Sequence, residues 1–193
     1  TSFVDLSAIV PGVTVAKNEG YKTIISIRGV GNETNQNAIA APSVAYHMDG
    51  VFIASPFALG TDFLDVERIE VLRGPQGTLF GQNSTGGAVN VISKAPSMDG
   101  GSGRMNVTFG DYNLRKVSTS NNFVVNDKIA TRFSLSSSTR DGFTKNIYTG
   151  QDLDDDNSKS FRTDWMFNLN DTSSLRVFGP VSYTHLRAHE TQR

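Results

Sequence analysis

The residues of this chain that most readily suggest chemistry are three aspartates in one acidic stretch, Asp152, Asp154 and Asp156. Their alternating spacing matches the first positions of a calcium-binding loop, where carboxylate oxygens surround the ion. Such a loop also needs a glycine for its sharp turn and a glutamate at its end, but Asn157 and Thr163 occupy those positions. We therefore interpret the stretch as a solvated acidic loop and predict no metal site.

Histidines suggest two further kinds of chemistry, metal binding and base catalysis. His185 and His189 have the i, i+4 spacing of zinc ligands on a helix, but the H-E-x-x-H order of a metalloprotease helix is absent. His47 shares a strand face with Asp49, yet no serine or cysteine nucleophile stands in a recognisable elbow or triad pattern. The chain is accordingly predicted to be no enzyme, to hold no cofactor and to use His47 structurally.

A glycine-rich stretch separates two runs that resemble buried strands, in ERIEVLRGPQGTLFGQNSTGGAVNVISK at 67–94. Gly81-x-x-x-x-Gly86 has the first spacing of a phosphate-binding loop, but Gly-Ala follows where Lys and Ser or Thr are needed. The motif GPQGTLFG at 74–81 instead indicates one helical turn, with Pro75 at its first position and a glycine just past its end. The glycines are expected to turn the chain from a strand into a short helix and then into another strand.

Composition excludes several classes of protein. With a net charge of −1 and a pI near 6.3, the chain lacks the basic balance of a nucleic-acid binder, so no nucleic-acid partner is expected. It has no cysteine, which rules out disulfides and thiolate metal sites. No apolar run approaches the ~18 residues of a membrane helix, and the first residues lack the features of a signal peptide. Either the protein stays inside the cell, or its true N-terminus precedes this chain.

The pattern of apolar and polar residues changes near Pro96. Before it, short apolar runs alternate with glycine-rich loops, and Asp49-Gly50 between two strand-like runs predicts a β-hairpin. After Ser102, apolar and polar residues alternate with a period of two, which places one set of side chains on each face of a sheet. The first set comprises Met105, Val107, Phe109, Val117, Thr119, Phe123, Val125, Ile129, Thr131, Phe133, Leu135, Phe161, Thr163, Trp165, Phe167, Leu169, Leu175 and Val177.

The turns between these strands favour a membrane barrel over a soluble sandwich, although alternation alone fits both. The turns at 126–128 and 170–173 are tight, whereas 141–158 is a long polar loop on the opposite rim, together with the turn at 110–113. Short turns on one side and longer loops on the other are typical of a transmembrane β-barrel. Strands of about 9 to 12 residues are also long enough to span a bilayer.

Three motifs together resemble the plug domain of TonB-dependent outer-membrane receptors: IxIRG at 25–29, MDGVFI at 48–53, and VERIEVLRGPQGTLFGQNSTGGAVNVISKAP at 66–96. The resemblance implies an α+β, mainly β, plug domain over 1–96. It implies an incomplete antiparallel transmembrane β-barrel of about five strands over 97–179, where whole receptors of this kind have about 22 strands. The alternation stops after Phe178, and 180–193 is predicted to be an extraneous tail.

The resemblance also implies a function. The chain is expected to be a fragment of a receptor in the cell outer membrane of a Gram-negative bacterium, which imports a scarce ligand with energy supplied through TonB. An iron-siderophore complex is the commonest ligand of this family, and carbohydrate, cobalamin or haem import is the alternative. TonB, reached through a segment missing here, the small-molecule ligand and outer-membrane lipid are the implied partners.

Two other classes of protein stay open as alternatives. A passive pore or adhesin barrel would need no plug, so the plug motif weighs against it. A soluble periplasmic binding module would use the apolar set to cover a core, and it would need no detergent in solution.

Ligand-binding residues are implied by position within the family. The loops at 31–41 and 54–62 correspond to the plug loops that face outward, where Asn35 and Gln36 offer amides for hydrogen bonds and Phe57 offers an aromatic face.

A latch between plug and barrel is the second implied site. Arg28 and Arg73 each end a strand-like run before a glycine and match plug arginines that face carboxylates on the barrel wall. A guanidinium in such a lumen needs a carboxylate or carbonyl partner. Glu70 is the candidate partner within the plug, and the wall carboxylates are expected on strands beyond this chain.

Overall fold

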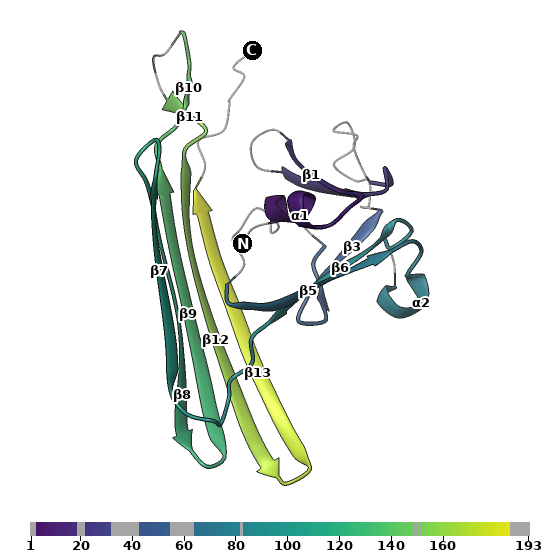
Figure 1. The fold of residues 1–193 in the computed structure, drawn as a ribbon, viewed down its shortest axis with the longest axis vertical. Helices are drawn as coiled ribbons and strands as arrows, with labels where there is room; N and C mark the ends of the chain where they lie inside the picture. Colours follow the sequence, from purple (N-terminus) through teal and green to yellow (C-terminus); the bar gives the residue numbers. More distant parts are fainter. Residues whose placement is uncertain are drawn as a thin grey trace. The chain divides into compact units, whose positions relative to one another are not determined.

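The computed structural model describes residues 3–18, 22–31, 43–54, 64–81, 83–148, 150 and 152–185 (Figure 1). Two compact units divide the chain, Thr1–Ser93 and Lys94–Arg193. No helix within the described ranges is long and apolar enough to cross a bilayer.

The first unit contains two short helices and two small sheets. Helix α1 (Phe3–Ile9) precedes an antiparallel pair of strands, β1 (Val13–Asn18) and β2 (Lys22–Ile27). A four-stranded sheet follows in the order β4-β3-β6-β5. Its strands are β3 (Val44–Met48), β4 (Val51–Phe52), β5 (Val66–Arg73) and β6 (Gly87–Ser93), with helix α2 (Gly77–Phe80) between β5 and β6 in sequence.

An aliphatic core covers one face of the four-stranded sheet. Tyr46 pairs with Val89 across β3 and β6, and Val71 pairs with Val89 from the other side, so this set of residues points to one face. Burial of each large apolar side chain contributes roughly 1.5–3 kcal/mol to folding. The buried cluster consists of Leu6, Val13, Ile25, Ile27, Val44, Tyr46, Val89 and Val91.

The hairpin predicted at Asp49-Gly50 is confirmed. Both turn residues have positive φ, 50° for Asp49 and 80° for Gly50, as a two-residue turn with the twist of the flanking strands requires. The pairs His47 with Phe52 and Met48 with Val51 then join β3 to β4.

The four-stranded sheet is mixed, because β6 pairs in parallel with β3 and antiparallel with β5. Gly87 begins β6 with a φ of +146°, and a Cβ atom there would collide with the carbonyl oxygen of Leu72 and with the side chain of Ile27. The close approach of β5 and β6 at this point therefore requires glycine.

The helical turn predicted in GPQGTLFG is confirmed, but it begins later than expected. Helix α2 spans Gly77–Phe80, so Pro75 precedes the helix and is not its first residue. The carbonyl of Gln76 accepts from the N–H groups of Leu79 at 3.1 Å and Phe80 at 2.9 Å, which makes Gln76 the N-cap. Gly81 ends the helix with a φ of 73°.

The second unit is dominated by an antiparallel sheet of five strands in the order β13-β12-β9-β8-β7. Figure 1 shows them as long strands side by side. They are β7 (Ser102–Gly110), β8 (Leu114–Asn126), β9 (Ile129–Arg140), β12 (Asp156–Asn170) and β13 (Ser173–His185). The predicted tight turns join β8 to β9 and β12 to β13, whereas residues 141–155 connect β9 to β12. Among the described strands β7 and β13 are edges, so these five strands form an open wall and not a closed barrel.

Alternation gives this sheet two different faces. One row of paired residues, Met105, Thr119, Leu135, Phe161 and Val181, crosses all five strands, and we call the face that carries it the apolar face. The row one residue further along, Asn106, Ser118, Ser136, Ser160 and Ser182, belongs to what we call the polar face. The predicted division of side chains between the two faces is confirmed.

The structure differs from the sequence-based expectation in the loop at 141–158. This segment contains a short hairpin of β10 (Thr144–Lys145) and β11 (Asp152–Leu153). Strand β12 then begins at Asp156, so Asp152 and Asp156 are strand residues and do not lie in an open loop.

The structure also differs at the end of β13, which continues past Phe178 to His185. Val181 pairs with Phe161 and Tyr183 with Lys159, so the alternation persists. Pairing with β12 supplies backbone hydrogen bonds to any residue in register, which explains why the strand continues through an atypical sequence. That 180–193 is an extraneous tail stays a prediction.

Candidate functional site

A row of polar side chains crosses the four-stranded sheet of the first unit on the face opposite its aliphatic core. The register places His47 beside Asn90, and Asn90 beside Glu70. Asn90 Nδ2 donates to Glu70 Oε2 at 3.0 Å. Arg68 lies two residues before Glu70 on β5, hence on the same face, and its Nε donates to Glu70 Oε1 at 2.9 Å.

The Glu70 carboxylate is held in its charged form by these donors. The hydrogen bond from Arg68 first, and that from Asn90 second, lower the pKa of Glu70 from its ordinary value of 4.5. The same bond to Glu70, and the charge of Glu67 beside it, raise the pKa of Arg68. Because the side chains of Arg68 and Glu70 are 53% and 39% exposed, solvent screens the pair, and it contributes little to stability.

His47 occupies the inner end of the polar row and is nearly enclosed. Its ring packs edge-on against Phe80 of α2, with centroids 4.9 Å apart, and tilted against Phe52 of β4 at 5.5 Å. Burial lowers the pKa of His47, so the imidazole is neutral at pH 7. This packing between two aromatic rings is that of a structural histidine.

Arg28 and Arg73, the predicted latch residues, lie exposed at the ends of their strands. Arg28 follows β2 with a φ of 53°, and its backbone N–H donates to the Gly12 carbonyl at 2.7 Å. Within the described ranges neither guanidinium forms an ion pair, and Glu70 is bound by Arg68 instead. A latch to carboxylates elsewhere in the protein stays a prediction.

The predicted ligand contacts Asn35, Gln36 and Phe57 lie outside the described residues. Their role stays a prediction.

A second polar cluster lies on the polar face of the five-stranded sheet, around Asp164 of β12. Arg162 Nη2 donates to Asp164 Oδ2 at 3.1 Å, and Arg176 Nε of β13 donates to Asp164 Oδ1 at 3.0 Å. Both guanidinium groups also lie over the ring of Phe178, at 4.8 Å and 5.6 Å from its centroid. Asp164 and Arg162 are 2% and 3% exposed, so each buried charge depends on its partner.

Hydroxyl groups occupy most of the remaining polar face. One pair of them, Ser160 Oγ and Ser182 Oγ, lies 2.9 Å apart across β12 and β13. Several of these hydroxyl side chains are buried, among them Ser134, Ser136, Ser138 and Ser160. The serines of this face are Ser102, Ser118, Ser120, Ser134, Ser136, Ser138, Ser158, Ser160, Ser174 and Ser182.

In the described residues, the charged groups of both clusters are paired with one another, and the ring of His47 packs against Phe52 and Phe80. In the part of the chain that is described, no group of three or more His, Asp or Glu side chains could hold a metal ion. Both clusters join neighbouring strands through paired polar groups and are suited to holding those strands in place.

Sequence reasoning missed Arg68, Asn90 and the partners of Asp164. Part of each cluster had a signal in the sequence. Arg68 with Glu70, and Arg162 with Asp164, are pairs of opposite charges two residues apart on one strand. This spacing puts both members of a pair on the same face. Asn90 and Arg176 join their clusters across strands, and such contacts depend on register.

Comparison with known proteins points to one family. Residues 1–88 match the family model described as the TonB-dependent receptor plug domain. The pesticin receptor of Yersinia pestis is 34% identical over 93 residues, which cover 47% of this chain and 13% of that protein. The catecholate siderophore receptor Fiu of Escherichia coli K12 is 31% identical over 109 residues, covering 54% of this chain and 14% of Fiu.

A similar match reaches a receptor for a different ligand, the vitamin B12 transporter BtuB of Vibrio vulnificus. It is 33% identical over 108 residues, covering 52% of this chain and 16% of BtuB. This chain therefore spans about one seventh of the length of the curated relatives it matches.

Solved structures share the fold over nearly all of the chain. The ferric yersiniabactin uptake receptor FyuA of Yersinia pestis superposes with a TM-score of 0.80 at 23% identity, covering 93% of this chain and 28% of FyuA. The pyoverdine outer membrane receptor FpvA of Pseudomonas aeruginosa, bound to pyoverdine, gives a TM-score of 0.72 at 18% identity, covering 90% of this chain and 24% of FpvA.

Proposed function

Because residues 1–88 match the family model of the TonB-dependent receptor plug domain, and a five-stranded sheet like that of solved receptors follows them, we propose that the whole protein imports a scarce ligand across the outer membrane with energy supplied through TonB. The ligand is a ferric siderophore complex. The protein changes no covalent bond in it and acts as a receptor and gate, not as an enzyme.

The observation that carries this proposal is the succession of the two units in one chain. A plug domain of about 90 residues precedes a meander of five long strands with one apolar and one polar face. An apolar outer face suits lipid, and a polar inner face suits a hydrated lumen. A passive pore has no use for the first unit. A soluble module would bury the apolar face in a core, whereas Met105, Leu135 and Val181 of this face are exposed.

The choice of a siderophore rests on the named relatives. Fiu is a catecholate siderophore receptor, FyuA takes up ferric yersiniabactin and FpvA binds pyoverdine. The match to BtuB favours cobalamin as the second candidate.

Within the plug, Asn35, Gln36 and Phe57 are proposed to contact the ligand, and Arg28 and Arg73 to latch the plug to carboxylates of the remaining wall. TonB is proposed to act through a segment outside this chain. The site of action is the cell outer membrane of a Gram-negative bacterium.

An uptake experiment tests the proposal. A strain lacking the gene is expected to lose uptake of at least one radiolabelled ferric siderophore under iron limitation, and a strain lacking TonB is expected to lose the same uptake. Labelled cyanocobalamin serves as the parallel ligand. Normal growth of the deletion strain on every iron source, combined with failure on vitamin B12 or on a polysaccharide, would replace the siderophore with that nutrient.

A further inference from the structure

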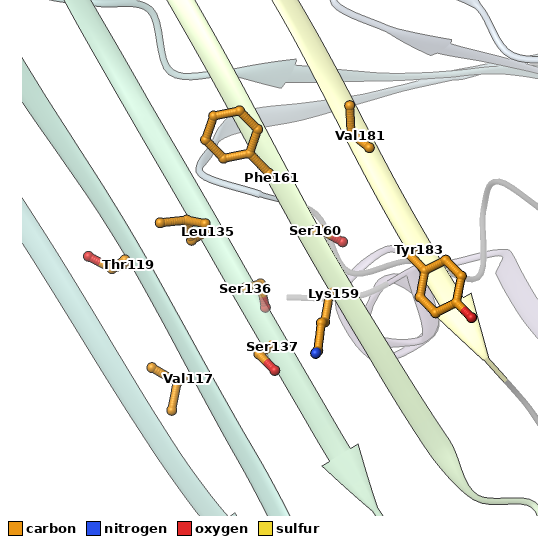
Figure 2. A pocket seen from close by; sticks show the side chains of 10 residues that line it. All are labelled: Val117, Thr119, Leu135, Ser136, Ser137, Lys159, Ser160, Phe161, Val181 and Tyr183. Carbon is orange, nitrogen blue, oxygen red and sulfur yellow. The ribbon is translucent and has the colours of Figure 1, made fainter.

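An open groove of 460 Å³ crosses the apolar face of the five-stranded sheet. It lies over β8, β9, β12 and β13, and Figure 2 shows its lining side chains on these neighbouring strands. Leu135 and Phe161 form its apolar centre, and both are largely exposed, at 48% and 38%. The same face also contributes Val117, Thr119, Ser137, Lys159, Val181 and Tyr183 to the lining.

Charge is distributed unevenly over this face. Among the strand residues whose side chains are described, the apolar face carries two charged groups, Arg115 and Lys159, and both are cations. Every aspartate within the five strands lies on the polar face or at a strand end. An anion that approaches the apolar face is therefore attracted by the two cations. No carboxylate among the described side chains of this face repels it.

Lys159 lines one end of the groove, and Arg115 lies just beyond that end, two residues before the lining residue Val117 on β8. Lys159 is paired with Ser137, and Arg115 is paired with Thr139, so two hydroxyl-bearing residues of β9 lie between the cations. Two strand spacings and one side-chain repeat separate Arg115 from Lys159, which places their Cα atoms about 12 Å apart. From Lys159 the groove runs towards Leu135 and Phe161, away from the polar end.

The cations also lie at the level where a hydrocarbon layer would end. Between Lys159 and Leu169 the apolar-face residues of β12 are Phe161, Thr163, Trp165 and Phe167. Ten residues of strand, tilted by about 40°, rise roughly 26 Å, close to the height of the apolar band of an outer-membrane barrel. A lysine at this level reaches the headgroup region with its ammonium while its stem stays on apolar surface.

We propose that this groove binds one acyl chain of a phosphate-bearing lipid of the outer leaflet, whose phosphates contact Lys159 and Arg115. This inference rests on the proposed function, because it takes the sheet to be part of an outer-membrane wall. The short turns at 127–128 and 171–172 lie at the far end of the strands, so the cations face the outer leaflet. Strands β8, β9 and β12 carry both cations and the apolar centre of the groove, so the site does not depend on the origin of Val181 and Tyr183.

Lipid retention by the whole protein tests this inference. The protein is purified and delipidated in a nonionic detergent, then mixed with micelles of the same detergent containing bisphosphorylated lipid A, the same lipid after enzymatic dephosphorylation, or phosphatidylcholine. A further sample receives inorganic phosphate, which separates recognition of a lipid from recognition of a free anion. Retained lipid is counted by native mass spectrometry.

Wild-type protein is expected to retain bisphosphorylated lipid A above the other two lipids, and inorganic phosphate is not expected to displace it. Lys159→Gln and Arg115→Gln are each expected to lower retention about fivefold, and the double variant about 25-fold, from the usual contribution of one basic residue near an anionic surface. Thr119→Phe, which fills the groove without changing charge, is expected to lower retention too. Lys128→Gln, in the short turn at the other end, is the matched control.

Equal retention of phosphorylated and dephosphorylated lipid, or wild-type retention by the double variant, would overturn the inference. Melting curves of every variant in the same detergent show whether the barrel is folded before retention is compared. Ligand uptake is a separate readout: normal uptake without lipid preference overturns the lipid site alone, whereas a protein that stays in solution without detergent overturns the proposed function as well.

Discussion

Asp164 of β12 accepts from Arg176 of the neighbouring strand at both of its carboxylate oxygens, with 3.0 Å from Arg176 Nε to Oδ1 and 2.5 Å from Nη2 to Oδ2. Arg162 adds a second guanidinium at 3.1 Å. A single buried carboxylate thus accepts hydrogen bonds from two guanidinium groups on the polar face.

Removing that charge is the first test of the polar face. Asp164→Asn leaves Arg162 buried without its carboxylate, and such a loss costs about 3–5 kcal/mol. We expect a lower midpoint for urea unfolding of the whole protein in detergent micelles. Asp171→Asn, in the exposed turn between β12 and β13, is the control and should change the midpoint little. Equal midpoints for the two variants would show that Asp164 is not required.

The part of this fold that local patterns determine was predictable from sequence. Alternation from Ile129 to Leu135 and from Phe161 to Leu169 assigns the two faces correctly, because a period of two is a property of any extended strand. The Asp49-Gly50 hairpin was predictable for a similar reason, since its turn needs two residues that tolerate positive φ.

What depends on contacts between distant segments was not predictable. The parallel pairing of 44–48 with 87–91 joins strands about 40 residues apart, and nothing in either run specifies parallel pairing. Arg176 reaches Asp164 only because β12 and β13 adopt one register. The start of α2 was misplaced because Pro75 suits a first helical position, whereas the carbonyl of Gln76 makes the first helical hydrogen bonds.

Gly87 provides a test of the close packing between β5 and β6. Gly87→Ala adds a Cβ atom that meets the Leu72 carbonyl oxygen and Ile27, at a φ of +146° that side chains rarely adopt. We expect a loss of at least about 2 kcal/mol in plug stability, from backbone strain and overpacking together. Limited proteolysis of the first unit would report it.

Gly101→Ala is the matched control for that substitution. Its Cβ atom would meet only the Asn122 carbonyl oxygen, at 3.7 Å, which is ordinary contact. Equal proteolysis rates in the two variants would contradict a steric requirement for glycine at 87.

The stability of the plug should fall in mild acid because of His47. Burial lowers the pKa of His47 from its ordinary value of 6.5, so the unfolded chain binds a proton at a higher pH than the folded one. The stability is therefore complete above pH 6.5 and is lost as the pH falls towards the folded pKa. Hydrogen exchange of 1–88, measured as a function of pH, should show faster opening over this range.

His47→Gln should flatten that pH dependence, and His185→Gln should leave it unchanged. Glu70 adds a separate loss at lower pH, since its lowered pKa gives stability that is present above 4.5 and lost below it. Arg68, Glu67 and Asn90 are the polar groups next to Glu70. A His47→Gln variant with an unchanged pH profile would assign the mild-acid loss to another group.

The proposed latch leads to a prediction about Arg28 and Arg73. The exposed positions of these residues in this chain would not by themselves lead to it. Where a carboxylate of the remaining wall faces each guanidinium in the whole protein, the double variant Arg28→Gln, Arg73→Gln leaves those carboxylates unpaired at a cost of about 3 kcal/mol. Hydrogen exchange within 1–88 should then be roughly 100-fold faster.

Arg68→Gln is the control for this double variant. The Arg68 guanidinium pairs with Glu67 and Glu70 inside the plug and is half exposed. Its loss should therefore change the exchange rate several-fold at most. If the control opens the plug as much as the double variant does, the plug is weakened by any lost surface charge, and Arg28 and Arg73 hold no special contact with the wall.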